Sequence, residues 1–153
     1  MFNLIITIIS IGIFAVFLAA GNSYFDSDKI ISIREKGKID AGIAKVSTAI
    51  TTYVLGKDEM PHSFSDIVPT YMNYPVLPQG LAWRSLSIEP LSGDISVCFG
   101  GIIDHSVYMA LIDSKRDAGE DDFIIGNDCG DKTDAAFDGK QIQYPVAVTY
   151  TIR

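Results

Sequence analysis

The sequence predicts an α+β protein in which a long N-terminal helix packs on a small antiparallel sheet. Residues 2–20 are an apolar run without a charged side chain, which favours a helix that enters a membrane. From Ile30 to Tyr53, apolar residues recur at steps of three and four, the spacing of one helix face. Residues 141–152 instead alternate apolar and polar side chains, which is typical of a strand with one buried face.

The apolar run, FNLIITIISIGIFAVFLAA, has the length of a membrane-spanning helix. At about 1.5 Å per residue it would rise about 28 Å, close to the hydrocarbon core of about 30 Å. A secretory signal cleaved after Ala20 is the alternative, because small residues surround that position. The run is longer than the usual apolar core of a signal and no Lys or Arg precedes it, so we expect a retained anchor over residues 1–25.

Two features of the sequence predict opposite orientations for this anchor. Four cations follow the run closely and would keep the rest of the chain in the cytoplasm by the positive-inside rule: Lys29, Arg34, Lys36 and Lys38. The two cysteines favour export, because a disulfide persists only in an oxidising compartment.

Residues 27–55 are predicted to form an amphipathic helix. Asp26 or Ser27 can cap its start, and Gly56 supplies its end, while Gly37 and Gly42 predict a bend. The predicted buried face consists of Ile30, Ile33, Ile39, Ile43, Val46, Ile50 and Tyr53. The predicted exposed face carries Lys36, Asp40, Lys45, Ser47 and Thr51.

Residues 57–80 hold four of the six prolines, with aromatic residues between them. Proline ends helices and donates no ladder hydrogen bond, so we expect a long ordered loop, with one helical turn at residues 63–68. A loop of this length either binds a partner or is a connection fixed by Phe64, Tyr71 and Tyr74. The composition favours the connection.

The sheet region is predicted over residues 81–153. Strands are expected at residues 81–91, 94–99 and 123–125, and most clearly at the C-terminal alternation. A short helix should begin at Asp104 or Ser106 and end near Gly119. Pro145 suggests that the last strand lies at an edge of the sheet or contains a bulge.

Two cysteines, Cys98 and Cys129, predict one disulfide if the domain is exported. Two unrelated thiols in a cytoplasmic domain are the alternative. The chain has no CxxC pair and no histidine near either cysteine, which speaks against a zinc site.

The acidic residues after Asp117 raise the question of a calcium site. Asp128, Asp131 and Asp134 are its candidate ligands, but their spacing lacks the EF-hand pattern, so a solvated acidic loop is favoured. The chain has no nucleophile, phosphate-binding or zinc-protease motif, and we expect no enzyme activity and no cofactor. A net charge of −7 without a basic stripe excludes nucleic acid as the expected partner.

Taken together, these features resemble a type IV pilin or pilin-like protein. That family has an uncharged membrane helix continuing into an amphipathic helix, then a loop, a small antiparallel sheet and a disulfide near the C-terminus. The corresponding parts are residues 2–25, 27–55, 57–80, 81–99 with 141–152, and Cys98 with Cys129. Size and layout are also similar to small inner-membrane accessory proteins of conjugative thin pili.

The resemblance implies a structural or assembly component of a type IV pilus-like system, a minor pilin or a biogenesis accessory protein. It would contact pilus or secretion-system proteins, pilin subunits included, and membrane lipid through residues 2–20. It would lie in the bacterial inner membrane as a single-pass protein, with residues 26–153 in the periplasm. The pilin family usually has a glutamate at the fifth mature position and a basic leader, whereas this chain has Ile5. The resemblance to the accessory proteins tolerates this difference better.

The alternative is a periplasmic or secreted binding module that has lost its signal. In that case the proline-rich loop and the acidic residues 117–138 would form its ligand or calcium surface.

Overall fold

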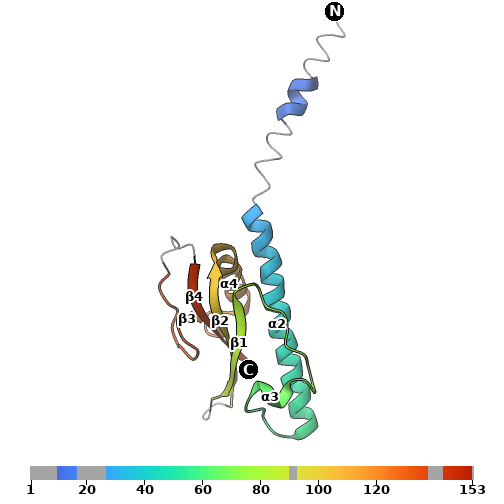
Figure 1. Ribbon diagram of the computed structural model, residues 1–153, viewed down its shortest axis with the longest axis vertical. Coiled ribbons are helices and arrows are strands. Elements are labelled where there is room, and N and C mark those ends of the chain that lie inside the picture. The colour runs from blue at the N-terminus through green and yellow to red at the C-terminus, as the bar shows by residue number, and fades with distance from the viewer. Residues whose placement is uncertain (1–9, 17–26, 90–92, 138–142, 153) are drawn as a thin grey trace, which may run out of the picture. The chain divides into compact units, whose positions relative to one another are not determined.

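The computed structural model describes residues 10–16, 27–89, 93–137 and 143–152 of the 153-residue chain. The chain divides into two compact units, Met1–Ile30 and Ile31–Arg153. In the first unit, residues 10–16 are helical. In the second, a long helix lies against a sheet, and a shorter helix covers the same sheet (Figure 1).

The described residues form one antiparallel sheet of four strands in the order β1-β2-β4-β3. The strands are β1 (Leu81–Ile88), β2 (Ile95–Asp104), β3 (Phe123–Gly126) and β4 (Gln143–Ile152). The β2–β4 ladder is the longest, and it runs from the pair Ile95 and Ile152 to the pair Asp104 and Gln143. These two central strands therefore join residues that are 39 to 57 positions apart along the chain, and they position the rest of the sheet.

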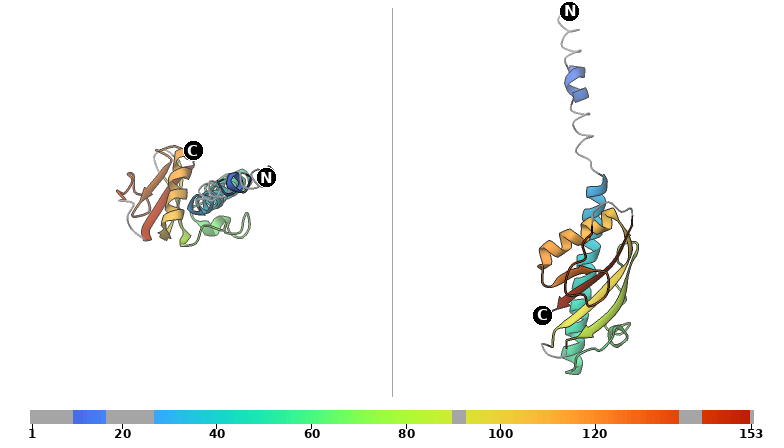
Figure 2. Two further views of the ribbon diagram at one scale, coloured as in Figure 1. Left: turned by 90° about the horizontal axis from the view of Figure 1, so that it is seen from above. Right: turned by 90° about the vertical axis from the view of Figure 1, so that its left-hand side faces the viewer.

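Two helices cover one face of this sheet, α2 (Ser27–Lys57) and α4 (His105–Ala118), as the view from above shows (Figure 2). Asp104 and Ser106 are the two predicted starts of α4, and the structure has Asp104, whose carboxylate accepts a hydrogen bond from the Val107 N–H at 2.9 Å. The predicted α+β class is confirmed, with a long helix on a small antiparallel sheet.

The core consists of two clusters, and α2 contributes to both. Ile39 and Ile43 pack with the centre of the sheet and with α4, around Phe99, Phe123 and Tyr144. Farther along α2 the second cluster combines its side chains with the proline-rich segment and the start of β2: Val46, Ala49, Ile50, Tyr53, Phe64, Ile67, Met72, Leu86, Ile95 and Val97. One face of α2 therefore contributes side chains to both parts of the core.

The predicted buried face of α2 is right from Ile39 onward and wrong in its first turns. Ile30 and Ile33 are 54% and 63% exposed, whereas Ser32 and Glu35 are buried. Residues are spaced about 100° apart round a helix, so Ile33 lies about 120° away from Ile39. Two residues six positions apart, such as Ile33 and Ile39, therefore lie on different faces of the helix. The prediction places both on one face because both are isoleucine.

The strand predicted at residues 94–99 is longer in the structure. The prediction ends it at residue 99 because two glycines follow. Strand β2 continues through Gly100 and Gly101 to Asp104. A Cβ atom on Gly101 would lie 1.8 Å from the carbonyl oxygen of Gly80, so only glycine allows β1 and β2 to approach there. These glycines permit close packing within the sheet and do not end the strand.

The expectation that Pro145 places the last strand at an edge is wrong for the strand as a whole. Strand β4 is central, and Pro145 is paired in register with Ile102 of β2. The pairing of β3 with β4 covers only residues 147–150 of β4, so β3 does not reach Pro145. Beyond the end of β3, the missing N–H of proline costs no ladder hydrogen bond on that side.

The proline-rich segment contains the predicted helical turn, α3 (Phe64–Ile67). The Asp66 carboxylate accepts hydrogen bonds from the backbone N–H groups of His62 and Ser63, at 2.8 and 2.9 Å. Phe64 and Ile67 are buried, while Tyr74 is 53% exposed. The segment is thus fixed to the core along its length, by Phe64 and Ile67 and then by the buried Met72, Pro75 and Pro78.

The predicted membrane anchor lies largely outside the described residues, which omit 1–9 and 17–26. Among the helices that are described, none combines the length and apolar character needed to cross a bilayer. The anchor stays a prediction.

Two neighbouring isoleucines of β2 provide a matched test of this core. Ile103 is 2% exposed and Ile102 is 61% exposed. We expect Ile103→Ala to lower the free energy of unfolding by about 2–5 kcal/mol, because it removes buried methylenes and leaves a cavity. Ile102→Ala should change it by about 0.5 kcal/mol or less. Chemical denaturation followed by circular dichroism measures both; equal losses would contradict the described orientation of β2.

Candidate interaction surface

The exposed face of α2 is a continuous row of uncharged side chains. We call it the outer stripe, and its members recur at steps of three and four: Ile33, Gly37, Ala41, Ala44, Thr48, Thr51 and Leu55. The two ends are apolar, with Leu55 83% exposed. A charged or long polar face is usual on the solvent side of a helix, so an uncharged stripe indicates a surface that another element can cover.

The threonine hydroxyls along this face are already hydrogen-bonded within the helix. Thr48 donates to the carbonyl oxygen of Ala44 at 2.8 Å, and Thr51 donates to that of Ser47 at 3.0 Å. Thr52, beside the stripe, donates to Thr48 at 2.8 Å. Because burying an unpaired hydroxyl is costly, hydroxyls satisfied in this way lower the cost of covering the stripe.

The middle of the outer stripe also consists of small residues. Ala41 and Ala44 have small side chains, and a Cβ atom built on Gly37 would meet nothing within 4 Å. Small residues allow the backbones of two helices to approach closely, and van der Waals contact then replaces water. The stripe therefore fits a partner helix better than a small ligand.

A cluster of polar contacts beside the stripe fixes α4 against α2. Lys36 pairs with Asp40 on its own helix and with Asp117 of α4, the latter at 2.9 Å. Ser114 of α4 donates a hydrogen bond to the other oxygen of Asp40 at 2.7 Å. The hydrogen bonds that Lys36 donates to Asp40 and Asp117 raise the pKa of Lys36 above its ordinary value, and Lys36 in turn lowers the pKa of Asp117.

Glu35 is a buried carboxylate near the start of the second unit, with its side chain only 6% exposed. Lys38 donates to it at 2.7 Å and Arg34 at 2.9 Å. Burial raises the pKa of Glu35, but the hydrogen bonds and charges of Lys38 and Arg34 outweigh this, so its pKa lies below the ordinary 4.5. The carboxylate is therefore ionised and holds two cations on one side of α2.

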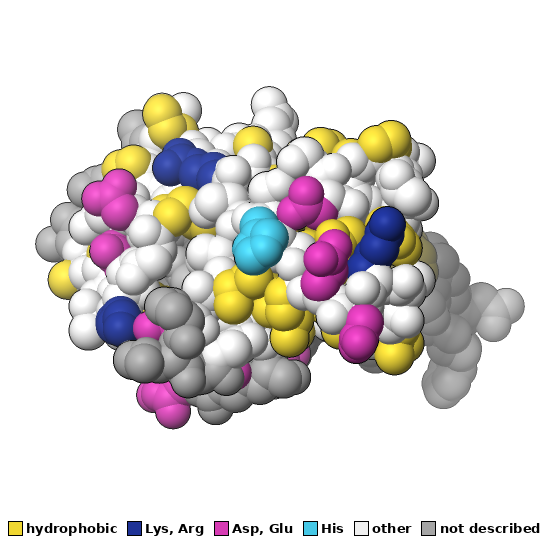
Figure 3. Space-filling model, turned by 90° about the horizontal axis from the view of Figure 1, so that it is seen from below, with side chains coloured by type: hydrophobic (Ala, Val, Ile, Leu, Met, Phe, Trp, Pro, Cys, Tyr) yellow, Lys and Arg dark blue, Asp and Glu magenta, His cyan; other side chains and the backbone are white. Residues whose placement is uncertain are grey.

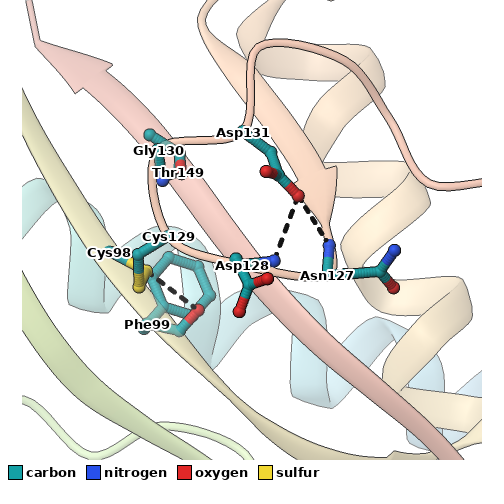
Figure 4. The surroundings of a disulfide bond; sticks show 8 residues. All are labelled: Cys98, Phe99, Asn127, Asp128, Cys129, Gly130, Asp131 and Thr149. Carbon is teal, nitrogen blue, oxygen red and sulfur yellow. Dashed lines mark hydrogen bonds between the residues drawn. A yellow bond between two sulfur atoms is a disulfide. The ribbon is translucent and has the colours of Figure 1, made fainter.

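The predicted disulfide is present, and it lies on the sheet face away from the two helices (Figure 4). Cys98 alternates along β2 with Val97 and Phe99, which point into the core. Its partner Cys129 belongs to the loop after β3, with a Cα–Cα distance of 5.7 Å. The bond closes the loop of residues 127–137 onto a face that no described helix covers.

The three candidate calcium ligands do not converge in the described loop. One Asp131 oxygen accepts hydrogen bonds from the N–H groups of Asn127 and Asp128, at 2.9 and 3.0 Å (Figure 4). Asp134 pairs with Lys115 and accepts from the Ile125 N–H at 2.9 Å. Within the described ranges, no group of three or more His, Cys, Asp or Glu could hold a metal ion. These carboxylates order the loop instead.

The end of the molecule at which α2 terminates is mixed in chemistry. Seen from below, it shows apolar, acidic and basic side chains side by side, with a histidine among them (Figure 3). No single sign of charge dominates the part of this face that is described. It offers less of a continuous surface than the outer stripe.

No protein-family model, curated protein or solved structure matches this chain in the comparisons made. The surfaces therefore have to be interpreted from their own chemistry. The sequence pattern alone does not reveal the outer stripe, because it places Ile33 on the buried face. The absence of charge at positions 37, 41, 44 and 48 is the signal that could have found it.

The disulfide should stabilise the protein substantially. Its cysteines are 31 positions apart, so the cross-link removes about 3–4 kcal/mol of loop entropy from the unfolded chain. We expect the double variant Cys98→Ala/Cys129→Ala to unfold at a lower temperature in a thermal scan by circular dichroism. Added reductant should lower the melting temperature of the wild type and leave that of the variant unchanged; a reductant effect on both would contradict this assignment.

The stability due to Glu35 should depend on pH. A carboxylate with a depressed folded pKa contributes fully above its unfolded pKa, and the contribution is lost as pH falls through the folded pKa. Glu35→Gln should therefore unfold about 1–3 kcal/mol more easily at pH 7, and this gap should shrink below about pH 4.5. Denaturation from pH 3 to 7 measures the gap, with exposed Glu120→Gln as the matched control. A gap that is constant across this range would count against the described pairing.

Proposed function

We propose that this protein is a membrane-anchored structural or assembly component of a type IV pilus-like system, acting through protein–protein contacts. The observation that carries the proposal is the outer stripe of α2. A row of uncharged, low side chains along a 31-residue helix is suited to packing against helices of other proteins.

The architecture supports this proposal. The long helix, the antiparallel sheet on one side of it and the disulfide between β2 and the loop before β4 correspond to the pilin-like layout. This correspondence concerns layout alone, since it rests on element order and not on a sequence motif.

The first unit supports the anchoring part of the proposal. Residues 10–16 are helical, and four of their apolar side chains are more than half exposed: Ile11, Ile13, Phe14 and Val16. An exposed apolar helix is unfavourable in water, and either lipid or other apolar helices would cover it.

A single charge placed on the outer stripe tests the proposal. Ala44 is exposed, so Ala44→Lys should fold normally, but an unpaired ammonium group would have to be buried in any helix–helix contact. In the membrane fraction of the native host, chemical cross-linking followed by mass spectrometry should join the wild type to pilus or secretion-system proteins. We expect Ala44→Lys to reduce this cross-linking about tenfold or more, which corresponds to about 1.4 kcal/mol.

Ala136→Lys is the matched control, because Ala136 is equally exposed but lies in the loop far along the chain from the stripe. It should cross-link like the wild type. Recovery of the wild type in the cytoplasmic fraction with both thiols free, or equal effects of the two lysine variants, would overturn the proposal.

A further inference from the structure

Positive charge is concentrated on α2, and the rest of the chain is acidic. Helix α2 carries six Lys or Arg and three Asp or Glu. The remaining residues carry six Lys or Arg and 16 Asp or Glu, so a net charge of +3 on α2 is set against −10 elsewhere. A molecule divided in this way presents surfaces of opposite charge, which favours contacts between unlike faces of two copies.

A groove on one flank of α2 gathers three of these cations. It has a volume of about 410 Å³, lies between α2 and residues 75–76, and is lined by Arg34, Lys38 and Lys45. The other lining residues are uncharged and include Gly37 and Ala41, which the groove shares with the outer stripe. Val76 is 79% exposed. The groove therefore combines a cationic wall with an apolar rim and contains no acidic lining residue.

The positive charge of this groove is only partly balanced within the chain. Arg34 and Lys38 both pair with the single carboxylate of Glu35. Among the described residues Lys45 forms no ion pair, and its exposed side chain is free to meet an external anion. The groove thus has an excess of positive charge without a partner in the described structure.

The matching acidic feature is the turn that follows α4. Gly119, with a φ of 105°, ends the helix and turns the chain, and the exposed Glu120 and Asp121 follow it. Neither carboxylate pairs with a described cation. The turn is therefore a compact, exposed pair of negative charges.

The turn cannot reach the groove of its own chain. Asp117 holds the end of α4 at Lys36, whereas Lys38 lines the groove. These two lysines lie about 160° apart round α2, so the end of α4 and the groove are on nearly opposite sides of the helix. A contact between turn and groove must join two molecules.

We propose that the groove at Arg34, Lys38 and Lys45 binds the Glu120–Asp121 turn of a second copy of this chain. The contact is head-to-tail, so a pair of copies keeps one free groove and one free turn, and further copies can add. This inference rests on the proposed assembly function and names one of its partners.

Charge reversal with rescue tests this contact. The full-length chain in a neutral detergent is examined by sedimentation velocity over a range of concentrations, at about 0.1 M and about 1 M salt, where the Debye length is about 10 Å and about 3 Å. The wild type should associate at the lower salt and less so at the higher. Lys45→Glu and Asp121→Lys should each weaken association about tenfold or more, and the double variant should restore it.

Lys57→Glu is the control, because it makes the same charge change on α2 outside the groove, and it should associate like the wild type. A wild type that stays monomeric, or a double variant that is no better than the single ones, overturns the inference. Binding of the wild type to vesicles containing an anionic phospholipid, weakened by Lys45→Glu without any self-association, would assign the groove to lipid and also overturn it. Because Ala44→Lys tests the outer stripe, the proposed function can survive that outcome.

Discussion

The packing of one face of α2 against the sheet is the interaction on which the rest of this structure depends. Ile39, Ile43, Val46 and Ile50 follow one another along that face, and each is nearly or fully buried. They contribute to both core clusters, so the centre of the sheet and the proline-rich segment are held by the same helix. Hydrophobic burial of this kind is the dominant favourable term in folding, and here one helix takes part in both clusters.

That packing also decides which surfaces remain for other molecules. A helix has one inner and one outer face, and the inner face of α2 is buried in the core. The outer stripe faces solvent with its hydroxyls already bonded to its own backbone, so it can be covered at low cost. The basic groove beside it, at Arg34, Lys38 and Lys45, has an excess of charge. Function on this protein is therefore expected along α2.

The opposite face of the sheet is covered by a loop and not by a helix. No described helix covers it, and the loop after β3 lies over it instead, fixed by the Cys98–Cys129 bond and by a hydrogen bond from the Gly130 N–H to the Thr149 hydroxyl at 2.9 Å. Covalent closure replaces the apolar contact area that a loop cannot supply. Asp131 and Asp134 of this loop accept backbone hydrogen bonds.

The sequence by itself determined the elements whose periodicity is long and regular. Local spacing and capping, which depend only on neighbouring residues, predict the α+β class, helix α2, the C-terminal strand and the helix after Asp104. The tertiary structure decided the rest: which side of α2 is buried near Ile33, that β2 continues through Gly101, and that β4 is central although it contains Pro145. Each depends on a partner distant along the chain, because burial and strand neighbours are properties of the packed molecule and not of a local pattern.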